Sequence, residues 1–482
     1  MLFNSLEFCV FLIVVTCLYY FLPWTWRWKM LLAASCIFYM AFIPAYILIL
    51  FTTILIDYFL GMRIEEAQEP RRKKRLLVIS IVATCAVLFV FKYFNFFTHT
   101  GNQMQMMLGL PATLPIADII LPIGLSFHTF QSLSYVIEVY RGRQKAERNF
   151  GIYSLYVMFY PQLVAGPIER PQRLLHQFYE DHKFQVENLA NGLLMIAWGF
   201  FKKMVIADRA AVYVNTVYGQ GWEAQPAVAL VLATVLFAVQ IYADFSGYSS
   251  IAVGCARLMG IQLMRNFHHP YFARSVADFW TRWHISLSTW FKDYVYIPLG
   301  GSRVPLPRHY ANLLITFAIS GLWHGANWTF VIWGVYNGVL LIVEQVAAPL
   351  FTRGPFLRWI WRAFTLVAVV LGWVFFRAVS MDQATTILRR IFSPWSLDKA
   401  TLQHTVLQFV GDNTSLAVGA VTLMLIAAMF VVEWWMEYGG GKARVAPLRS
   451  SLVLKGAITV LLFQLIMLFG VLQSSSFIYF QF

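Results

Sequence analysis

The chain has 482 residues, of which 59% are hydrophobic and 12% charged, and its formal net charge is +14. Soluble domains normally contain about 25% charged residues, so this composition excludes an ordinary soluble protein and indicates that lipid is the solvent. The Lys and Arg residues lie between apolar runs, which favours a role in membrane topology and argues against nucleic acid as a partner. We therefore expect an all-α polytopic membrane protein in contact with membrane lipids.

Apolar runs follow one another along almost the whole chain and predict about 11–12 transmembrane helices. The first run has no Lys or Arg before it, which is atypical of a cleaved signal peptide. Pro44 divides another apolar stretch into two short runs, which suggests a hairpin of two helices. The expected spans are residues 6–22, 30–43, 45–60, 76–97, 116–139, 187–205, 226–245, 311–323, 325–347, 362–377, 413–435 and 452–472.

The loops between the first spans alternate in charge. Residues 62–75 are basic, residues 98–115 contain neither Lys nor Arg, and residues 141–148 are basic again. Because Lys and Arg are retained on the cytoplasmic side, this alternation predicts cytoplasmic basic loops and an N-terminus outside.

Two segments have the composition of re-entrant membrane segments. Residues 151–168 are interrupted by Pro161, and residues 246–262 are rich in small residues and contain Arg257. Irregular backbone at membrane depth is tolerated only inside protein or beside water. We therefore expect both segments to border a cavity.

Residues 275–294 have apolar side chains at helical spacing, which predicts one amphipathic helix at the membrane surface. Ser275 and Asp278 resemble a helix-starting capping box. His284 lies within the apolar face, where a lone histidine is more often structural than functional. Three basic residues lie in or just after this helix: Arg282, Lys292 and Arg303.

Residues 311–343 form an uncharged run that contains His324. A straight helix of this length would measure about 50 Å, against roughly 30 Å for the hydrocarbon core, so we expect a break marked by Gly321 and Gly325. Ionisable groups at membrane depth usually line a functional cavity. We expect His324 to be functional and the two glycines to admit a substrate; the alternative is a histidine hydrogen-bonded between helices.

Two histidines without a serine-centred nucleophile motif suggest general acid–base chemistry. A neutral imidazole can take the proton of a hydroxyl as that oxygen attacks a thioester, and this needs no cofactor beyond the acyl donor. Metal binding by His268, His269 and His284 would lack a carboxylate at a familiar spacing, so we predict no metal. The five cysteines lie in apolar surroundings and indicate no disulfide.

Four long segments resemble the signatures of the bacterial membrane-bound O-acyltransferase family, most closely its alginate O-acetyltransferase-like branch. They are FWTRWHISLSTWFKDYVYIPLGGSR, GLWHGANWTFVIWG, YPQLVAGPIERP and YADFSGYSSIAVG. The resemblance extends over nearly the whole chain. One departure is Ser250, which stands where this branch leads us to expect an acidic residue.

The resemblance implies one integral membrane domain, 1–482, shaped as a ring of helices around a central funnel or tunnel. Its expected parts are N-terminal helices in 1–150, a catalytic core in 151–345 and C-terminal helices in 346–482. It implies that His324 is catalytic and that His284 is the second functional histidine. The residues expected to line the tunnel are Trp323, Gly321, Gly325, Asn327, Asp293 and Tyr294.

The resemblance also implies a function in a bacterial inner membrane. An acetyl group would pass from cytoplasmic acetyl-CoA, held by Arg282, Lys292 and Arg303, to a partner protein or polysaccharide on the outer side. Alginate is favoured as the final acceptor; cellulose, peptidoglycan and D-alanylation-type transfer remain alternatives. A secondary transporter is the alternative of a different class, but it should have two halves with matching hydropathy, which this sequence lacks.

Overall fold

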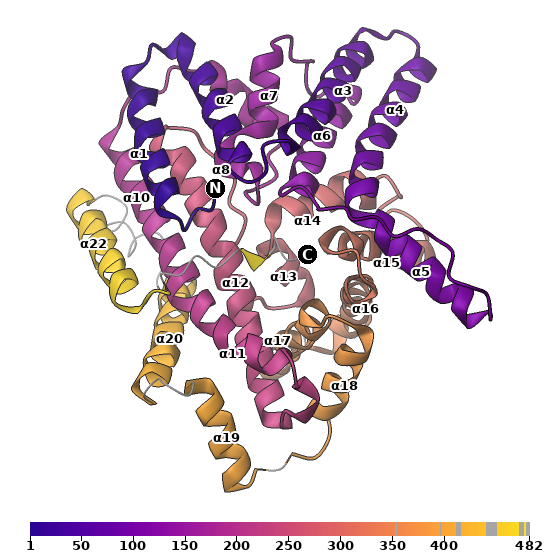
Figure 1. Ribbon diagram of the computed structural model, residues 1–482, viewed down its shortest axis with the longest axis vertical. Helices are drawn as coiled ribbons and strands as arrows, with labels where there is room; N and C mark the ends of the chain where they lie inside the picture. The colour runs from indigo at the N-terminus through magenta and orange to yellow at the C-terminus, as the bar shows by residue number, and fades with distance from the viewer. Residues whose placement is uncertain (352–353, 396, 411–415, 440–450, 472–476, 479–482) are drawn as a thin grey trace. The chain divides into compact units, whose positions relative to one another are not determined.

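The computed structural model describes residues 1–351, 354–395, 397–410, 416–439, 451–471 and 477–478. All regular secondary structure within these ranges is helical, which confirms the all-α prediction (Figure 1). Eight of the described helices are long and apolar enough to cross a membrane: Tyr46–Glu66, Pro70–Met107, Val186–Tyr218, Ala227–Leu258, Trp328–Leu350, Pro355–Arg377, Gly419–Tyr438 and Leu452–Phe469. The first few residues of the expected span 413–435 lie outside the described residues.

The chain divides into two compact units. The first contains Met1–Ile196 and Ile251–Met264. Its helices are α1 (Leu6–Phe21), α2 (Trp24–Met40), α3 (Tyr46–Glu66), α4 (Pro70–Leu88), η1 (Phe89–Tyr93), α5 (Phe94–Met107), α6 (Leu125–Tyr140), α7 (Phe150–Met158), α8 (Tyr160–Leu163), α9 (Pro171–Leu174), η2 (Leu175–Tyr179) and most of α10 (Val186–Phe200).

The second unit contains Ala197–Ser250 and Arg265–Phe482. Its helices are η3 (Phe201–Ala207), α11 (Asp208–Tyr218), η4 (Trp222–Ala224), most of α12 (Ala227–Leu258), η5 (Pro270–Phe272), α13 (Val276–Arg282), α14 (Ile285–Phe291), η6 (Lys292–Tyr296), α15 (Leu306–His324), α16 (Trp328–Phe351), α17 (Pro355–Arg377), α18 (Met381–Ile391), α19 (Lys399–Val410), α20 (Leu416–Tyr438) and α22 (Leu452–Phe469).

A carboxylate inside the first unit connects three of its helices. Asp57 of α3 is fully buried and accepts hydrogen bonds from the hydroxyls of Ser80 and Thr84 on α4 and of Ser132 on α6. An ionisable group within a membrane-spanning helix is expensive unless other groups satisfy it. These three hydroxyl donors therefore hold α3, α4 and α6 together at that level.

The region after α4 differs from the prediction. The helix continues through η1 to Met107, so the first half of the expected loop 98–115 is helical, and the expected span 116–139 is helical only from Leu125 onward. Prolines at 111, 115 and 122 prevent an earlier helix, because proline removes a backbone donor. The non-helical stretch is held against α5: Asn102 donates to the carbonyl of Leu114 at 3.0 Å and accepts from its amide at 2.9 Å.

The prediction of a re-entrant segment at 246–262 is wrong, because α12 is one continuous helix to Leu258. Its small residues instead allow a neighbouring helix to approach. A Cβ atom on Gly247 would lie 2.7 Å from the carbonyl oxygen of Gly199, and one on Gly254 would lie 2.8 Å from that of Gly192. Small residues at helix interfaces permit such close packing in membranes.

The segment 151–168 is broken, as its prolines predicted. Helix α7 ends at Met158, and α8 has only four residues before the chain turns. Whether the segment is re-entrant stays a prediction.

The expected break in the run 311–343 is confirmed, because α15 ends at His324 and α16 begins at Trp328. Gly321 lies inside α15, where a Cβ atom would meet the carbonyl oxygen of Phe330 at 2.2 Å. Gly334 faces α15 in the same way, because a Cβ atom added there would lie 2.1 Å from the carbonyl oxygen of Phe317. The two helices therefore form a hairpin whose backbones approach through glycines.

This packing predicts that Gly321→Ala destabilises the protein, because a methyl group has no room between the two backbones. Overpacking of this kind typically costs about 1–3 kcal/mol. Thermal unfolding of the purified protein in detergent is the measurement. Gly456→Ala in α22 is the matched control, because a Cβ atom there meets nothing within 4 Å. Equal melting temperatures for the two variants would contradict the close packing.

Candidate active site

His284 lies in a sharp turn and not in the middle of a helix. The amphipathic helix expected over 275–294 is instead two short helices, α13 and α14, separated at Trp283 and His284. His284 has φ 42° and ψ 55°, a left-handed conformation. Such a backbone is uncommon for residues other than glycine, and surrounding structure has to hold it in place. The start of α13 is as predicted, with the Ser275 hydroxyl accepting from the Asp278 amide.

The segment 266–268 enforces this turn from both sides. The Ile285 amide donates to the carbonyl of Asn266 at 2.9 Å, and the His268 amide donates to the carbonyl of Arg282 at 2.9 Å. The Asn266 side chain also accepts from the amide and hydroxyl of Ser286 at 3.2 and 2.9 Å, so it caps the start of α14. The shape of the His284 turn therefore depends on Asn266.

His324 is the last residue of α15 and is 4% exposed. Its Nδ1 lies 2.7 Å from the carbonyl oxygen of Ser320. Since a carbonyl can only accept, Nδ1 carries the proton of this hydrogen bond. In this neutral tautomer Nε2 is the nitrogen that carries no proton. One turn of helix thus selects the tautomer of His324.

The fold brings the two predicted histidines together. The ring centroids of His284 and His324 are 6.3 Å apart, and the rings are nearly perpendicular. Aromatic rings surround the pair: Phe245 lies 4.5 Å from His284, and Trp333 lies 5.0 Å from His324. Further rings against His324 are Trp323 at 5.1 Å and Phe376 at 5.6 Å.

The surroundings keep His284 neutral. Burial lowers the pKa of its imidazole well below the ordinary value, and the neighbouring His324 lowers it further. Two rings this close in an apolar interior do not both carry a charge, because desolvation and mutual repulsion both disfavour it. The pair is suited to moving one proton.

The glycines beside His324 pack closely against other parts of the chain. A Cβ atom on Gly321 would meet backbone of α16, and one on Gly325 would meet the ring of Phe330 at 2.2 Å. Both glycines therefore permit close packing on that side, and their expected place along a tunnel stays a prediction.

Arg282 is already neutralised by two carboxylates. Its Nε donates to Asp278 at 2.8 Å and its Nη1 donates to Glu437 at 2.8 Å, with the side chain 12% exposed. A phosphate of the donor would have to displace these carboxylates, and the expected role of Arg282 in donor binding stays a prediction. Lys292 and Arg303 are exposed, and within the described part of the chain neither has an ion pair.

Among the other residues expected to line the tunnel, Trp323 lies beside both histidines, with ring centroids 6.1 Å from His284 and 5.1 Å from His324. The Asn327 side chain accepts from the Thr329 amide at 3.0 Å and donates to the Val379 carbonyl at 3.2 Å, so it holds the start of α16. Asp293 and Tyr294 are half-buried in η6, where the Tyr294 ring packs on Trp290.

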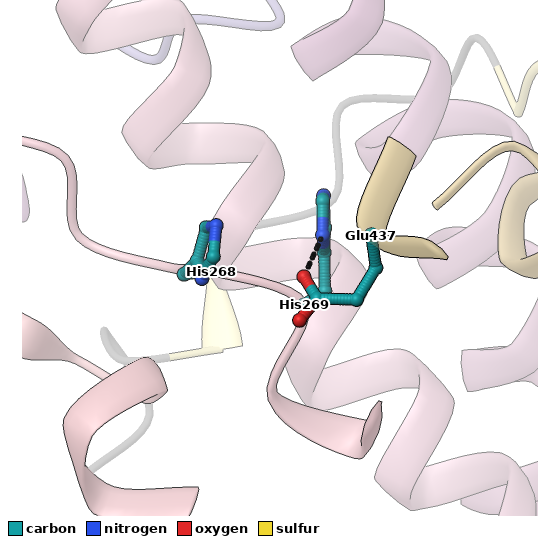
Figure 2. Close-up of side chains that lie close together, drawn as sticks. All are labelled: His268, His269 and Glu437. Atoms are coloured by element: carbon teal, nitrogen blue, oxygen red, sulfur yellow. Dashed lines mark hydrogen bonds and ion pairs between the residues drawn. The ribbon is translucent and has the colours of Figure 1, made fainter. Parts of the chain in front are cut away.

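Figure 2 shows the described residues whose possible metal-ligand atoms lie close together, namely His268, His269 and Glu437. Their ligand atoms lie within 4.8 Å of one another, and His269 Nδ1 is 3.2 Å from a Glu437 oxygen. The other oxygen of this carboxylate accepts from Arg282, so a divalent cation would lie beside a guanidinium. This geometry suits a structural ion pair better than a metal centre.

The sequence reasoning missed two buried lysines. Lys203 pairs with Asp208 at 2.9 Å and with Asp244 at 2.7 Å, and Lys202 pairs with Glu433 at 2.7 Å. Asp244 immediately precedes Phe245, the ring that packs on His284, so these ion pairs help to fix one wall of the site. Adjacent lysines inside an apolar run were the available signal.

The fold and this site define a multi-pass membrane protein with a buried histidine pair suited to proton transfer. A family model for the membrane-bound O-acyltransferase family matches residues 147–381. The chain is 37% identical to the probable alginate O-acetylase of Azotobacter vinelandii over 85% of its own length and 82% of the relative's. It is 31% identical to the peptidoglycan O-acetyltransferase of Helicobacter pylori, over 84% and 82% of the two lengths. With the teichoic acid D-alanyltransferase of Bacillus subtilis the identity is 27%, over 54% and 66%.

The chain therefore belongs to the membrane-bound O-acyltransferase family and is an acyltransferase.

The hydrogen bonds by which Asn266 holds the His284 turn predict the effect of Asn266→Ala. Loss of this side chain leaves the Ser286 amide without its acceptor, which costs about 1–3 kcal/mol. The displaced turn should also slow acyl transfer about 10–100-fold, because small misplacements of a reacting group are costly. Asn266→Asp keeps the accepting oxygen and should recover most of the activity. Asn188→Ala is the control, because the hydrogen bond of this half-buried asparagine to Gln185 is exposed. Equal activity of Asn266→Ala and this control would contradict the positioning role.

Proposed function

We propose that His324 is the general base of O-acyl transfer, with its Nε2 accepting the proton of the attacking hydroxyl. The observation that carries the proposal is the Nδ1–Ser320 hydrogen bond beside the His284 ring. As the hydroxyl oxygen forms the new ester bond, its proton passes to Nε2. The carbon–sulfur bond of the donor breaks, and the leaving thiolate takes that proton back, so the ring ends neutral.

His284 has a positioning part in this proposal. Its neutral ring orients the donor thioester against His324, while the aromatic wall excludes water that would hydrolyse the thioester. The nearly perpendicular arrangement of the two rings supports these separate roles, because only the His324 ring has to hold the proton.

The acyl group in this proposal is acetyl, and acetyl-CoA is the donor. The names of the relatives support acetyl transfer to a polysaccharide, with an alginate-type exopolysaccharide favoured as the final acceptor. Peptidoglycan, cellulose and D-alanylation-type transfer are the alternatives. An acetyltransferase or acceptor protein on the outer side would pass the group to the polymer.

The proposed location is the inner membrane of a bacterium, with the N-terminus outside. The positive loops 62–75 and 141–148 support cytoplasmic positions for those segments. On this topology Lys292 and Arg303 reach the cytoplasmic donor. A secondary transporter is disfavoured, because transport by itself does not call for a histidine whose tautomer is fixed.

His324→Gln is the sharpest test of the general base. Glutamine has similar bulk and hydrogen-bonding capacity but cannot take a proton at neutral pH. Loss of a positioned general base typically costs about 10²–10⁴-fold in rate, so transfer of labelled acetyl from acetyl-CoA by the purified variant should fall by that amount.

The fold of this variant is checked by its melting temperature and by its monodispersity in detergent. An exposed histidine changed in the same way, His176→Gln, is the control. A well-folded His324→Gln protein with near wild-type transfer would rule out His324 as the general base.

The proposed donor site predicts a different kinetic pattern. Neutralising Lys292 and Arg303 to Gln together should raise KM for acetyl-CoA roughly tenfold and leave kcat unchanged, because phosphate contacts contribute uniform binding. Lys399→Gln, another exposed cation, should have no effect. An unchanged KM in the double variant would remove these residues from the donor site.

A further inference from the structure

The first unit contains a cavity that is separate from the histidine pair. The first turns of α6 form one wall, and α7, α8 and the chain that follows them form the other. Its volume is about 10 Å³, which is close to the space that one water molecule needs. The polar side chains that line it are His128, Gln131 and Gln162.

Polar atoms in this cavity lack partners. His128 is 2% exposed, and neither of its ring nitrogens has a hydrogen-bond partner among the described residues. The Oε1 of Gln162, 3% exposed, also lacks one within that part of the chain. Buried polar groups are rarely left in this state, so a partner from outside the chain is indicated.

The orientation of the two amides is fixed by the backbone. The Nε2 atoms of Gln131 and Gln162 both donate to the carbonyl of Tyr156 at 2.8 Å. The Oε1 of Gln131 accepts from the Glu169 amide at 3.0 Å. Because each Nε2 must face a carbonyl, Gln162 presents an accepting oxygen to the cavity.

The backbone keeps the cavity in shape. A Cβ atom on Gly166 would lie 2.3 Å from Gln162 Cα, and one on Gly124, which has φ 79°, would lie 2.8 Å from the carbonyl oxygen of Leu163. Gly124, just before α6, therefore lies directly against the main chain of the opposite wall. Only small groups enter the space between them.

These atoms define the chemistry of the ligand. A neutral imidazole offers one donor and one acceptor, and Gln162 adds a second acceptor. A carboxylate or phosphate oxygen could donate to neither acceptor, whereas a hydroxyl group both donates and accepts. We propose that this cavity binds a hydroxyl group between His128 and Gln162, either a water molecule or the hydroxyl of a small alcohol.

The direct test is an experimental structure of the full chain in lipid nanodiscs, at a resolution that reveals ordered water. One sample is free of alcohols, and a second contains glycerol as the probe. A single peak within hydrogen-bond distance of His128 and Gln162 in both samples supports the proposal and assigns water. A peak that becomes glycerol in the second sample supports it and assigns an alcohol site. An empty cavity in both samples would overturn it.

Substitution of His128 gives an independent measurement of the same contacts. If a hydroxyl is bound, His128→Phe removes its hydrogen bonds and should lower the melting temperature by roughly 2 °C or more. His128→Asn keeps a donor and an acceptor and should recover part of that loss. If the site is empty, removing two unpaired nitrogens should leave stability unchanged or raise it, and that result would count against the proposal. His176→Phe, at an exposed histidine, is the control.

Discussion

The left-handed backbone of His284 depends on a second segment of chain, and the candidate site depends on that backbone. Two main-chain hydrogen bonds and the Asn266 side chain hold the turn. Without them, the local sequence would continue as one amphipathic helix and His284 would lie on its apolar face. With them, the ring leaves the helix and lies 6.3 Å from the ring of His324. The contacts of segment 266–268 thus divide the expected surface helix and place His284 beside His324.

Hydrogen bonds and ion pairs within the chain also hold other polar groups of the interior, because lipid offers no partners. Asp57 is satisfied by three hydroxyls, Lys203 by two carboxylates and His324 by the Ser320 carbonyl. In the first two cases the pairing fixes helices, and in the third it selects which nitrogen of the ring can take a proton. Hydrogen bonds within the chain therefore both hold the helices and set the protonation of the His324 ring.

Local signals predicted the features that depend on local sequence. The break after His324 followed from the length of an uncharged run, and the start of α13 followed from Ser275. The family's motifs then indicated both histidines. The sequence did not indicate partners from other segments. Glu437 engages Arg282 from 155 residues away, and Asn266 holds the His284 turn from a preceding segment. The small residues of 246–262 favoured a re-entrant segment beside a cavity, but the carbonyl oxygen of Gly199 lies 2.7 Å from where a Cβ atom on Gly247 would be.

The central claim is that the two rings act as one unit in acyl transfer. The most direct measurement is a double-mutant comparison of single-turnover transfer rates with His284→Asn, His324→Gln and both together. Asparagine suits the left-handed turn, so it removes the imidazole and keeps the backbone. If the rings are one unit, the double variant should be about as slow as the slower single variant, because the effects of cooperating residues are strongly non-additive. Losses that simply multiply would mean that the rings act independently and would contradict the claim.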